Sequence, residues 1–175
     1  MIKRVEDCLI DAKEEMLICD LLRESFPQYP ADQSFLNQRP SFRFLSYKKD
    51  ILIGHLGVES RVISIDGQVF RIFGIVDLCI HKDHQKKKMA SKMVEELIAF
   101  GKSCKIDFLL LFSSEKSFYQ KIGFQEEQNK SRWLMIQKLK TLGVARRNVG
   151  DSLMIKKIGQ KEWLAGELDL LGHIF

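Results

Sequence analysis

The sequence of 175 residues has none of the segments that mark membrane-spanning, secreted or zinc-finger proteins. No run approaches the roughly 18 apolar residues of a membrane-spanning helix, and charged residues close to Met1 interrupt any apolar leader. The four cysteines form no C-x-x-C pair and no zinc-finger spacing with histidines, so we expect reduced thiols. No internal repeat or linker is visible. We therefore expect a single cytoplasmic domain over residues 1–175, with residues 159–175 as a tail packed on it.

The positive charge of the chain is concentrated in one place. The hydrophobic share of 45% and the charged share of 29% are ordinary for a globular protein, and the net charge is +5. Much of the excess comes from four lysines between positions 82 and 88. A nucleic-acid-binding protein more often spreads its charge over a face with interleaved aromatic residues. A compact anionic ligand therefore fits this loop better than a nucleic acid does.

Residues 75–124 predict a strand, a helix and a second strand around that basic loop. We expect a strand over residues 75–80, an amphipathic helix over residues 89–102 and a buried strand over residues 108–112. Such a unit places its two strands parallel, with a right-handed crossover. The loop then brings the first N–H groups of the helix, at the positive end of its dipole, to any bound anion. The pattern indicates a phosphate site.

The rest of the chain favours antiparallel neighbours. Asp66 and Gly67 are a strong hairpin signal between two long strand patterns, residues 51–65 and 68–80. A capping box that begins at Asp11 predicts a helix ending before two prolines. The other expected elements are strands over residues 43–47, 133–139 and 152–158, and a polar loop over residues 143–151. These patterns predict an α/β fold with a mixed, mostly antiparallel sheet.

Two short motifs carry a resemblance to a known family. Residues 80–90, IHKDHQKKKMA, are similar to the acyl-CoA loop of the GNAT superfamily of N-acetyltransferases, in which an aliphatic residue leads into Gln/Arg-x-x-Gly-x-Gly/Ala. Residues 118–124, FYQKIGF, resemble its second signature, a Phe-Tyr before Gly-Phe. Residues 110–119 and 163–175 faintly resemble aminoglycoside N-acetyltransferases and nodulation-type N-acyltransferases. The resemblance implies a GNAT-like sheet with flanking helices, whose central parallel strand pair is splayed at the acyl-CoA site.

The resemblance also implies the chemistry and the ligands. An acetyl group, or another acyl group, would move directly from acetyl-CoA or another acyl-CoA to a primary amine of a small molecule or peptide, within a ternary complex. We expect no metal, no nucleic acid and no membrane partner, and either a monomer or a homodimer. The residues that would hold the acyl-CoA are Leu78, Cys79, Ile80, Gln85, Lys86, Lys87, Lys88, Met89, Ala90 and Ser91.

Lys88 departs from the family pattern, because a glycine is expected at this position. If the backbone is left-handed there, lysine costs about 1–2 kcal/mol. If it is not, the ammonium group simply adds a phosphate contact. A weak or inactive acyl-CoA-binding module is therefore one alternative function, and a basic nucleic-acid-binding protein is another.

Tyr119 is the candidate for the catalytic acid. By resemblance it donates a proton or a hydrogen bond to the departing CoA thiolate. A phenol with an unperturbed pKa of about 10 is protonated at neutral pH and can act in this way. The alternative is a tyrosine that only packs against Phe124.

Asp77 is the candidate for the catalytic base, because it is a carboxylate inside an otherwise apolar strand. Partial burial would raise its pKa and allow it to take a proton from the amine. Alternatively, local N–H groups or a lysine satisfy it. Cys79 has no histidine at a recognisable spacing, so we do not expect covalent catalysis. The weaker candidates for the base are Glu59, His55 and His81.

The end of the chain allows two interpretations. Glu167 and Asp169 provide negative charge that could meet a cationic amine acceptor. Alternatively, the apolar residues around them only cover an edge of the sheet.

Overall fold

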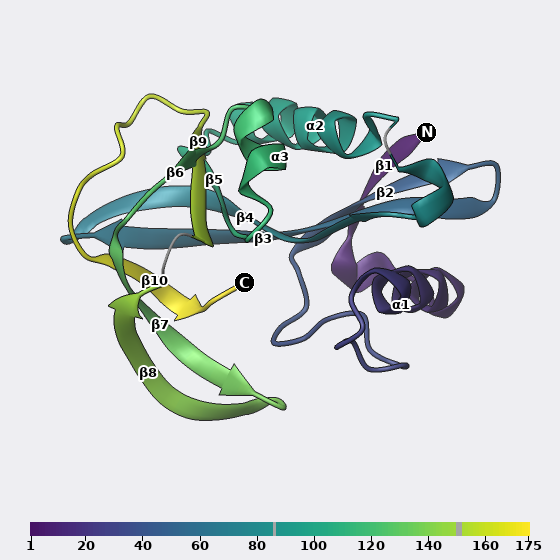
Figure 1. The fold of residues 1–175 in the computed structure, drawn as a ribbon, viewed down its shortest axis with the longest axis horizontal. Coiled ribbons are helices and arrows are strands. Elements are labelled where there is room, and N and C mark those ends of the chain that lie inside the picture. The colour runs from purple at the N-terminus through teal and green to yellow at the C-terminus, as the bar shows by residue number, and fades with distance from the viewer. Residues whose placement is uncertain (86, 150–151) are drawn as a thin grey trace. The chain divides into compact units, whose positions relative to one another are not determined.

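The computed structural model describes residues 1–85, 87–149 and 152–175 (Figure 1). The chain forms two compact units. The first consists of Met1–Glu59 and Ile75–Leu97, and the second of Ser60–Gly74 and Ile98–Phe175. Strands β3 (Ile51–Ile65) and β4 (Gln68–Ile80) contribute residues to both units.

The first unit contains antiparallel strands and the N-terminal helix. β1 (Ile2–Glu6) pairs with β2 (Phe42–Lys48), and β2 pairs with β3. Helix α1 (Ala12–Ser25) begins as predicted, because the Asp11 carboxylate accepts a hydrogen bond from the Glu14 N–H at 2.8 Å. The unit also has two short 3-10 helices, η1 (Asp7–Leu9) and η2 (Lys82–His84). Its apolar cluster comprises Ile18, Leu21, Leu22, Tyr29, Leu45, Leu52 and Cys79.

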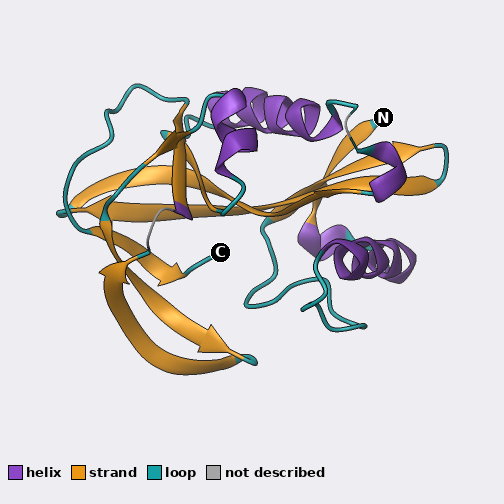
Figure 2. Cartoon of the chain, in the orientation of Figure 1, coloured by secondary structure: helices purple, strands orange, loops and turns teal. Residues whose placement is uncertain are grey.

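The second unit holds most of the strands, drawn in orange in Figure 2. The strand order is β6-β9-β5-β4-β3-β10-β7-β8. The pairs β4–β5 and β10–β7 are parallel, whereas β5–β9, β6–β9, β7–β8 and β3–β10 are antiparallel. The elements are β5 (Phe108–Phe112), α3 (Lys116–Lys121), β6 (Gln125–Glu126), β7 (Lys130–Gln137), β8 (Lys140–Asn148), β9 (Leu153–Lys157) and β10 (Leu168–His173).

The predicted strand–helix–strand unit is confirmed. β4 and β5 run parallel, with Ile72 opposite Phe108, and helix α2 (Met89–Ser103) ends one residue later than expected. The hairpin at Asp66 and Gly67 is also formed. Both residues have left-handed backbone, with φ of 47° and 86°, which is what a type I′ turn requires. The predicted fold class, α/β with a mixed and mostly antiparallel sheet, is correct.

Two predictions about the last part of the chain are wrong. Residues 143–148 are not loop but belong to β8, which pairs with β7; the rest of the predicted loop includes residues 150 and 151, outside the described residues. β8 ends the strand order, and most of its side chains are exposed, so it has no buried alternation to reveal it. The tail does not cover an edge, because β10 lies between β3 and β7. The assignment of residues 1–175 to one domain stays a prediction.

The core of the second unit is strongly aromatic. The Phe108 ring packs edge-to-face against Phe70 and Trp163, with ring centroids 5.7 and 5.1 Å away. A Cβ added at Gly74 would lie 2.6 Å from the Phe175 ring, so only glycine allows that ring to approach the strand.

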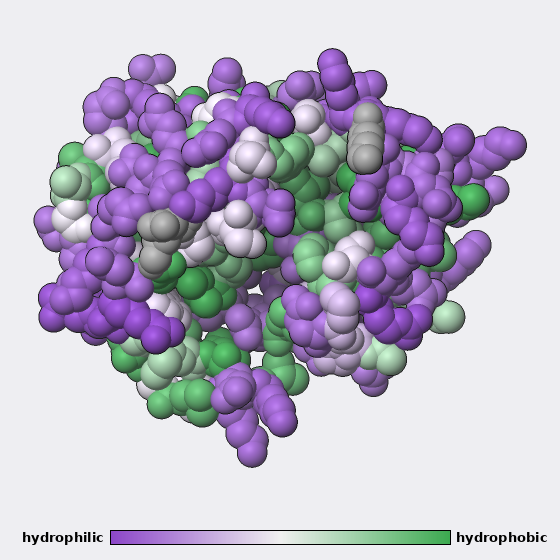
Figure 3. Space-filling view, in the orientation of Figure 1, coloured by the Kyte–Doolittle hydropathy of each residue, from purple (hydrophilic) through white to green (hydrophobic). Residues whose placement is uncertain are grey.

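Apolar side chains also remain exposed on this unit, and Figure 3 shows green residues over β7 and β8. The exposed apolar side chains of the second unit include Leu139, Leu142, Val144 and Leu171. Within the described chain, no helix combines the length and hydropathy needed to cross a membrane.

Candidate active site

The start of helix α2 presents the main-chain N–H groups that the sequence predicts as donors for an anion. The first hydrogen bond of the helix runs from the Lys92 N–H to the Lys88 carbonyl, at 3.1 Å. The N–H groups of Met89, Ala90 and Ser91 come before it, so they have no partner within the helix. They lie at the positive end of the helix dipole, where a phosphate group is stabilised.

The loop before the helix is tied back to the end of β4. The Gln85 side-chain amide donates to the Ile80 carbonyl at 3.1 Å, and the Lys87 ammonium donates to the Asp83 carbonyl at 3.1 Å. Lys82 pairs with Glu24 at 3.1 Å, which offsets part of the charge that the sequence assigned to this loop. Lys86, also predicted to bind the cofactor, lies outside the described residues.

Lys88 adopts the left-handed backbone that the family glycine would favour. Its φ is +57°, so of the two possibilities raised by the sequence the strained one holds, at a cost of about 1–2 kcal/mol. The side chain is exposed and its carbonyl accepts the first helical hydrogen bond. The backbone therefore forms the turn into α2 with a lysine at the position where the family pattern has glycine.

Asp77 lies inside β4 with an irregular backbone. Its φ of +52° is unusual for a strand residue, and its carbonyl accepts a hydrogen bond from His55 Nδ1 at 2.8 Å. Its carboxylate accepts a short hydrogen bond from the Tyr29 hydroxyl. Burial raises the pKa of Asp77 above its usual range, against the opposing effects of Tyr29 and Arg43, and the nearby Glu59 charge raises it further. A carboxylate with a raised pKa is suited to accept a proton.

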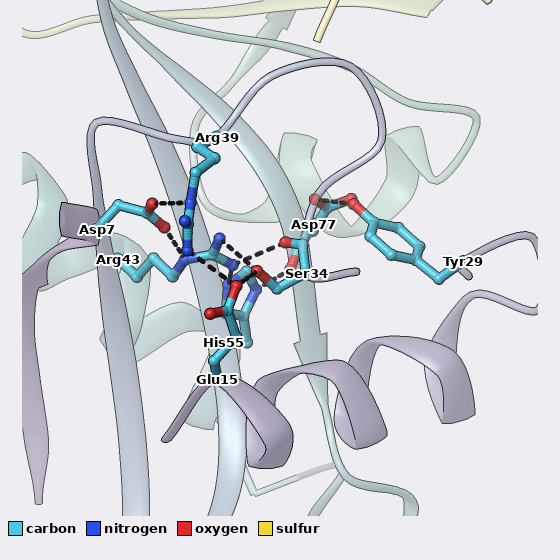
Figure 4. A network of polar contacts seen from close by, with 8 residues as sticks. All are labelled: Asp7, Glu15, Tyr29, Ser34, Arg39, Arg43, His55 and Asp77. Carbon is cyan, nitrogen blue, oxygen red and sulfur yellow. Dashed lines mark hydrogen bonds and ion pairs between the residues drawn. The ribbon is translucent and has the colours of Figure 1, made fainter. Parts of the chain in front are cut away.

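A buried arginine belongs to the same network of polar contacts as Asp77 (Figure 4). Arg43 has no exposed surface; it donates to the Asp7 carboxylate at 2.7 Å, to the Ser34 carbonyl at 3.0 Å and to His55 Nε2 at 2.9 Å. Arg39 donates to the other Asp7 oxygen at 2.7 Å. A buried charge without such partners would cost several kcal/mol, so the unit depends on this set of contacts.

His55 is neutral and its tautomer is fixed. Arginine only donates, so His55 Nε2 must accept from Arg43 and Nδ1 must carry the hydrogen that is donated to Asp77. Burial, followed by the Arg43 charge, lowers the pKa of His55 to about 3. A neutral histidine with both ring nitrogens engaged is not a base for the reaction.

The remaining strand-end residues lie where the sequence placed them. Leu78, Cys79 and Ile80 are the last residues of β4, and the N–H of the following His81 donates to the Ile53 carbonyl at 3.0 Å. Burial raises the pKa of the Cys79 thiol to about 12, which disfavours the thiolate needed for covalent catalysis. His81 lies 3.5 Å from Glu24.

Tyr119 belongs to the second unit, in α3. Its ring packs against Phe118 and Phe124, with centroids 5.0 and 5.5 Å away, so the packing expected for the structural alternative is present. Burial, and then the charge of Glu115, raise its pKa to about 12. The phenol is therefore protonated at neutral pH, as an acid must be. Its role as the catalytic acid stays a prediction.

Sequence reasoning missed most of the polar network in the first unit. Tyr29 and Ser34 lie between α1 and β2, in a segment without a recognisable motif. Arg43 gave one usable signal, because it is a charged residue between Phe42 and Phe44 in a strand pattern. At the other end of the chain, Arg146 and Arg132 contact the carboxylates that had been considered for the acceptor. These pairs are Arg146–Glu167 at 2.6 Å and Arg132–Asp169 at 3.6 Å.

A sequence model of the acetyltransferase (GNAT) domain matches residues 9–126, more than half of the chain. The chain therefore belongs to the GNAT acetyltransferase family, and the resemblance noted in its sequence is confirmed. No curated protein matches the chain in sequence.

Solved structures of this family share the fold. The Escherichia coli N-acetyltransferase YhbS, in complex with CoA, has a TM-score of 0.65 at 13% identity, over 97% of this chain and 88% of that one. An aminoglycoside 6'-N-acetyltransferase complexed with coenzyme A has 0.61 at 13%, over 92% and 99%. A Brucella melitensis GNAT acetyltransferase in complex with acetyl-CoA has 0.61 at 10%, over 96% and 94%. At these identities the likeness shows the fold alone.

Proposed function

We propose that the protein is an acyl-CoA-dependent N-acetyltransferase that moves an acetyl group from acetyl-CoA to a primary amine of a small molecule or peptide. The observation that carries this proposal is the start of α2, where the N–H groups of Met89, Ala90 and Ser91 follow a strand end and a basic loop. A diphosphate bound there would lie beside the ammonium groups of Lys87 and Lys88. We expect the protein to act in the cytoplasm.

In the proposed reaction the amine nitrogen attacks the thioester carbonyl carbon directly. The C–N bond forms, the C–S bond breaks, and the nitrogen gives up one proton. Asp77 takes that proton, either directly or through a water molecule, and Tyr119 gives one to the departing thiolate. Holding both substrates in one complex contributes much of the rate. The rate should rise with pH through a pKa above the roughly 3.9 of an exposed aspartate.

The left-handed Lys88 favours a second candidate, a module that binds acyl-CoA without turnover. Its side chain occupies a position at which glycine lets the phosphate approach the backbone. Such a protein would bind acetyl-CoA but would release no thiol with any amine.

The first experiment separates these functions. Isothermal titration with CoA and acetyl-CoA should detect binding that weakens as salt rises, and thiol release should then appear with one or more members of an amine panel. Binding without thiol release would support the module. Steeply salt-dependent binding to DNA or RNA with indifference to CoA would contradict both.

The second experiment tests the acid. Tyr119→Phe should lower kcat about 100-fold or more, the range of general acid catalysis, while the Kd for CoA stays unchanged. Tyr47→Phe is the matched control, because Tyr47 donates to Glu14 within the first unit and should leave kcat unaffected. Equal kcat values for Tyr119→Phe and the wild type would remove Tyr119 as the acid.

A further inference from the structure

The backbone of β4 is held in an unfavourable conformation at the candidate base. A left-handed backbone costs a residue other than glycine about 1–2 kcal/mol, and Asp77 adopts it between two apolar neighbours within a strand. Strain of this kind persists only where the surroundings determine the conformation. Some contact in the first unit must therefore hold Asp77 in place.

The contact with the right geometry comes from His55. Its Nδ1–H donates to the Asp77 carbonyl at 2.8 Å, across from the neighbouring strand β3. That carbonyl is therefore bound by a buried side chain of the neighbouring strand. The hydrogen bond fixes the orientation of the Asp77 peptide group and thus of the side chain attached to it.

His55 itself cannot turn away. The ring has no exposed surface, and Arg43 donates to its Nε2 at 2.9 Å. Arg43 is in turn held by the Asp7 carboxylate at 2.7 Å. The chain of contacts in Figure 4 thus runs from η1, through two buried side chains, to the main chain of Asp77.

The carboxylate of Asp77 is held from the opposite side. The Tyr29 hydroxyl donates to it, and Tyr29 is buried in the segment that follows α1. His55 therefore acts on the main chain of Asp77 and Tyr29 acts on its side chain. Together, these two hydrogen bonds determine the position of the Asp77 carboxylate.

We propose that His55 is a positioning residue for the acetyl transfer: its Nδ1–H holds the Asp77 peptide group in the left-handed turn that places the carboxylate for proton removal. This inference rests on the proposed function, in which Asp77 is the base. His55 neither gains nor loses a proton in the reaction.

The test compares two substitutions of His55. His55→Leu removes the donor, whereas His55→Asn keeps an N–H donor near the position of Nδ1. We expect His55→Leu to lower kcat about 10- to 100-fold, as a small displacement of a reacting group does, with the KM for acetyl-CoA nearly unchanged. His55→Asn should restore most of that loss. Ser131→Ala in the second unit is the control, because Ser131 is equally buried and lies in another strand.

Two outcomes would overturn the proposal. One is equal kcat for His55→Leu and His55→Asn; the other is a kcat that follows the unfolding temperature in all three variants, since a purely structural role predicts that relation. A measurement on the wild type covers the case in which His55→Leu does not fold. NMR of the imidazole nitrogens should find the hydrogen on Nδ1, and a hydrogen on Nε2 would also refute the proposal.

A failure of the proposed function can be recognised separately. If the wild type releases no thiol with any amine, the acetyltransferase assignment fails, whereas the NMR measurement still decides whether His55 donates to Asp77. In a crystal structure of His55→Leu, Asp77 should relax toward an ordinary extended φ, because the donor that holds its carbonyl is gone. If Asp77 stays left-handed in that variant, the positioning role is excluded, whatever the enzyme does.

Discussion

The interiors of the two units differ in how they use polar groups. The first unit buries the charged side chains of Arg43 and Asp7 together with a neutral His55, and this chain of contacts ends at Asp77. The second unit buries a mainly apolar and aromatic cluster. It also buries the Asp107 carboxylate, which pairs with the exposed Lys161 at 3.2 Å. Its buried Asn129 is uncharged and binds Trp163 and the carbonyl of Leu164.

The two interiors therefore contribute differently: the first fixes a geometry, and the second supplies folding energy. A buried ion pair is a weak source of net stability, but leaving one of its members alone is very costly. The first unit therefore gains little folding energy from Arg43 and Asp7, while it gains a fixed geometry at the residue that our proposal makes the base. The second unit pairs its buried Asp107 with an exposed lysine and relies mainly on apolar burial, which contributes roughly 25 cal/mol per Å².

The largest effect is expected from Asp7→Asn. The substitution keeps the shape of the side chain but leaves the buried Arg43 guanidinium without its counter-charge, and we expect the free energy of unfolding to fall by about 3–5 kcal/mol. Urea denaturation measures it. Glu95→Gln on the exposed side of α2 is the control and should change the value by less than about 0.5 kcal/mol. A loss below about 1 kcal/mol for Asp7→Asn would show that the network does not constrain the first unit.

Acid should act on the first unit through His55. The folded pKa of about 3 lies below the unfolded value of about 6.5, so the unfolded state binds more protons between these values. Stability from this residue is complete above pH 6.5 or so and falls with decreasing pH by about 1 kcal/mol per unit. Urea denaturation between about pH 7 and 4.5 should show this fall in the wild type and a smaller one in His55→Asn. Parallel curves would mean that His55 titrates normally.

A smaller effect is expected from the neutral contacts of the second unit. Asn129 accepts from Trp163 Nε1 at 2.8 Å and donates to the carbonyls of Leu164 and Gly166 at 3.0 and 2.9 Å. Asn129→Ala leaves these groups without that partner, and we expect a loss of about 2 kcal/mol in urea denaturation. Gln137→Ala at the exposed end of β7 is the control. A loss as large as that of Asp7→Asn would remove the contrast between the two interiors.

Much of the fold could be predicted from the sequence because its signals are local. The Asp11 cap, the Asp66–Gly67 turn and the apolar run 108–112 each depend on residues close together in the chain. β8 and β10 could not be predicted in this way. Their exposed or mixed side chains become strand residues only through pairing with distant segments, as in the register of Leu168 with Ile65.

The candidate site was predictable only in part, for a similar reason. Asp77 and the loop before α2 stand out in the sequence, because a carboxylate interrupts an apolar strand and lysines follow it. Tyr29 and Arg43 do not, because their importance comes from contacts across 48 and 36 positions. A hydrogen bond between distant residues leaves no periodic pattern for a single sequence to reveal.

The smallest effect is expected at Lys88, where the first unit meets its proposed ligand. Glycine removes the roughly 1–2 kcal/mol cost of a left-handed lysine but loses more conformational freedom on folding. The net result for Lys88→Gly should be a gain of less than about 1 kcal/mol in urea denaturation without ligand. Lys92→Gly, the same substitution inside α2, should instead lose about 1 kcal/mol. A gain in the free energy of unfolding for Lys88→Gly, together with a loss for Lys92→Gly, would show that the fold imposes on Lys88 a backbone conformation that lysine disfavours. Equal losses would mean that Lys88 is unstrained, and the case for an impaired acyl-CoA site would then lose its physical basis.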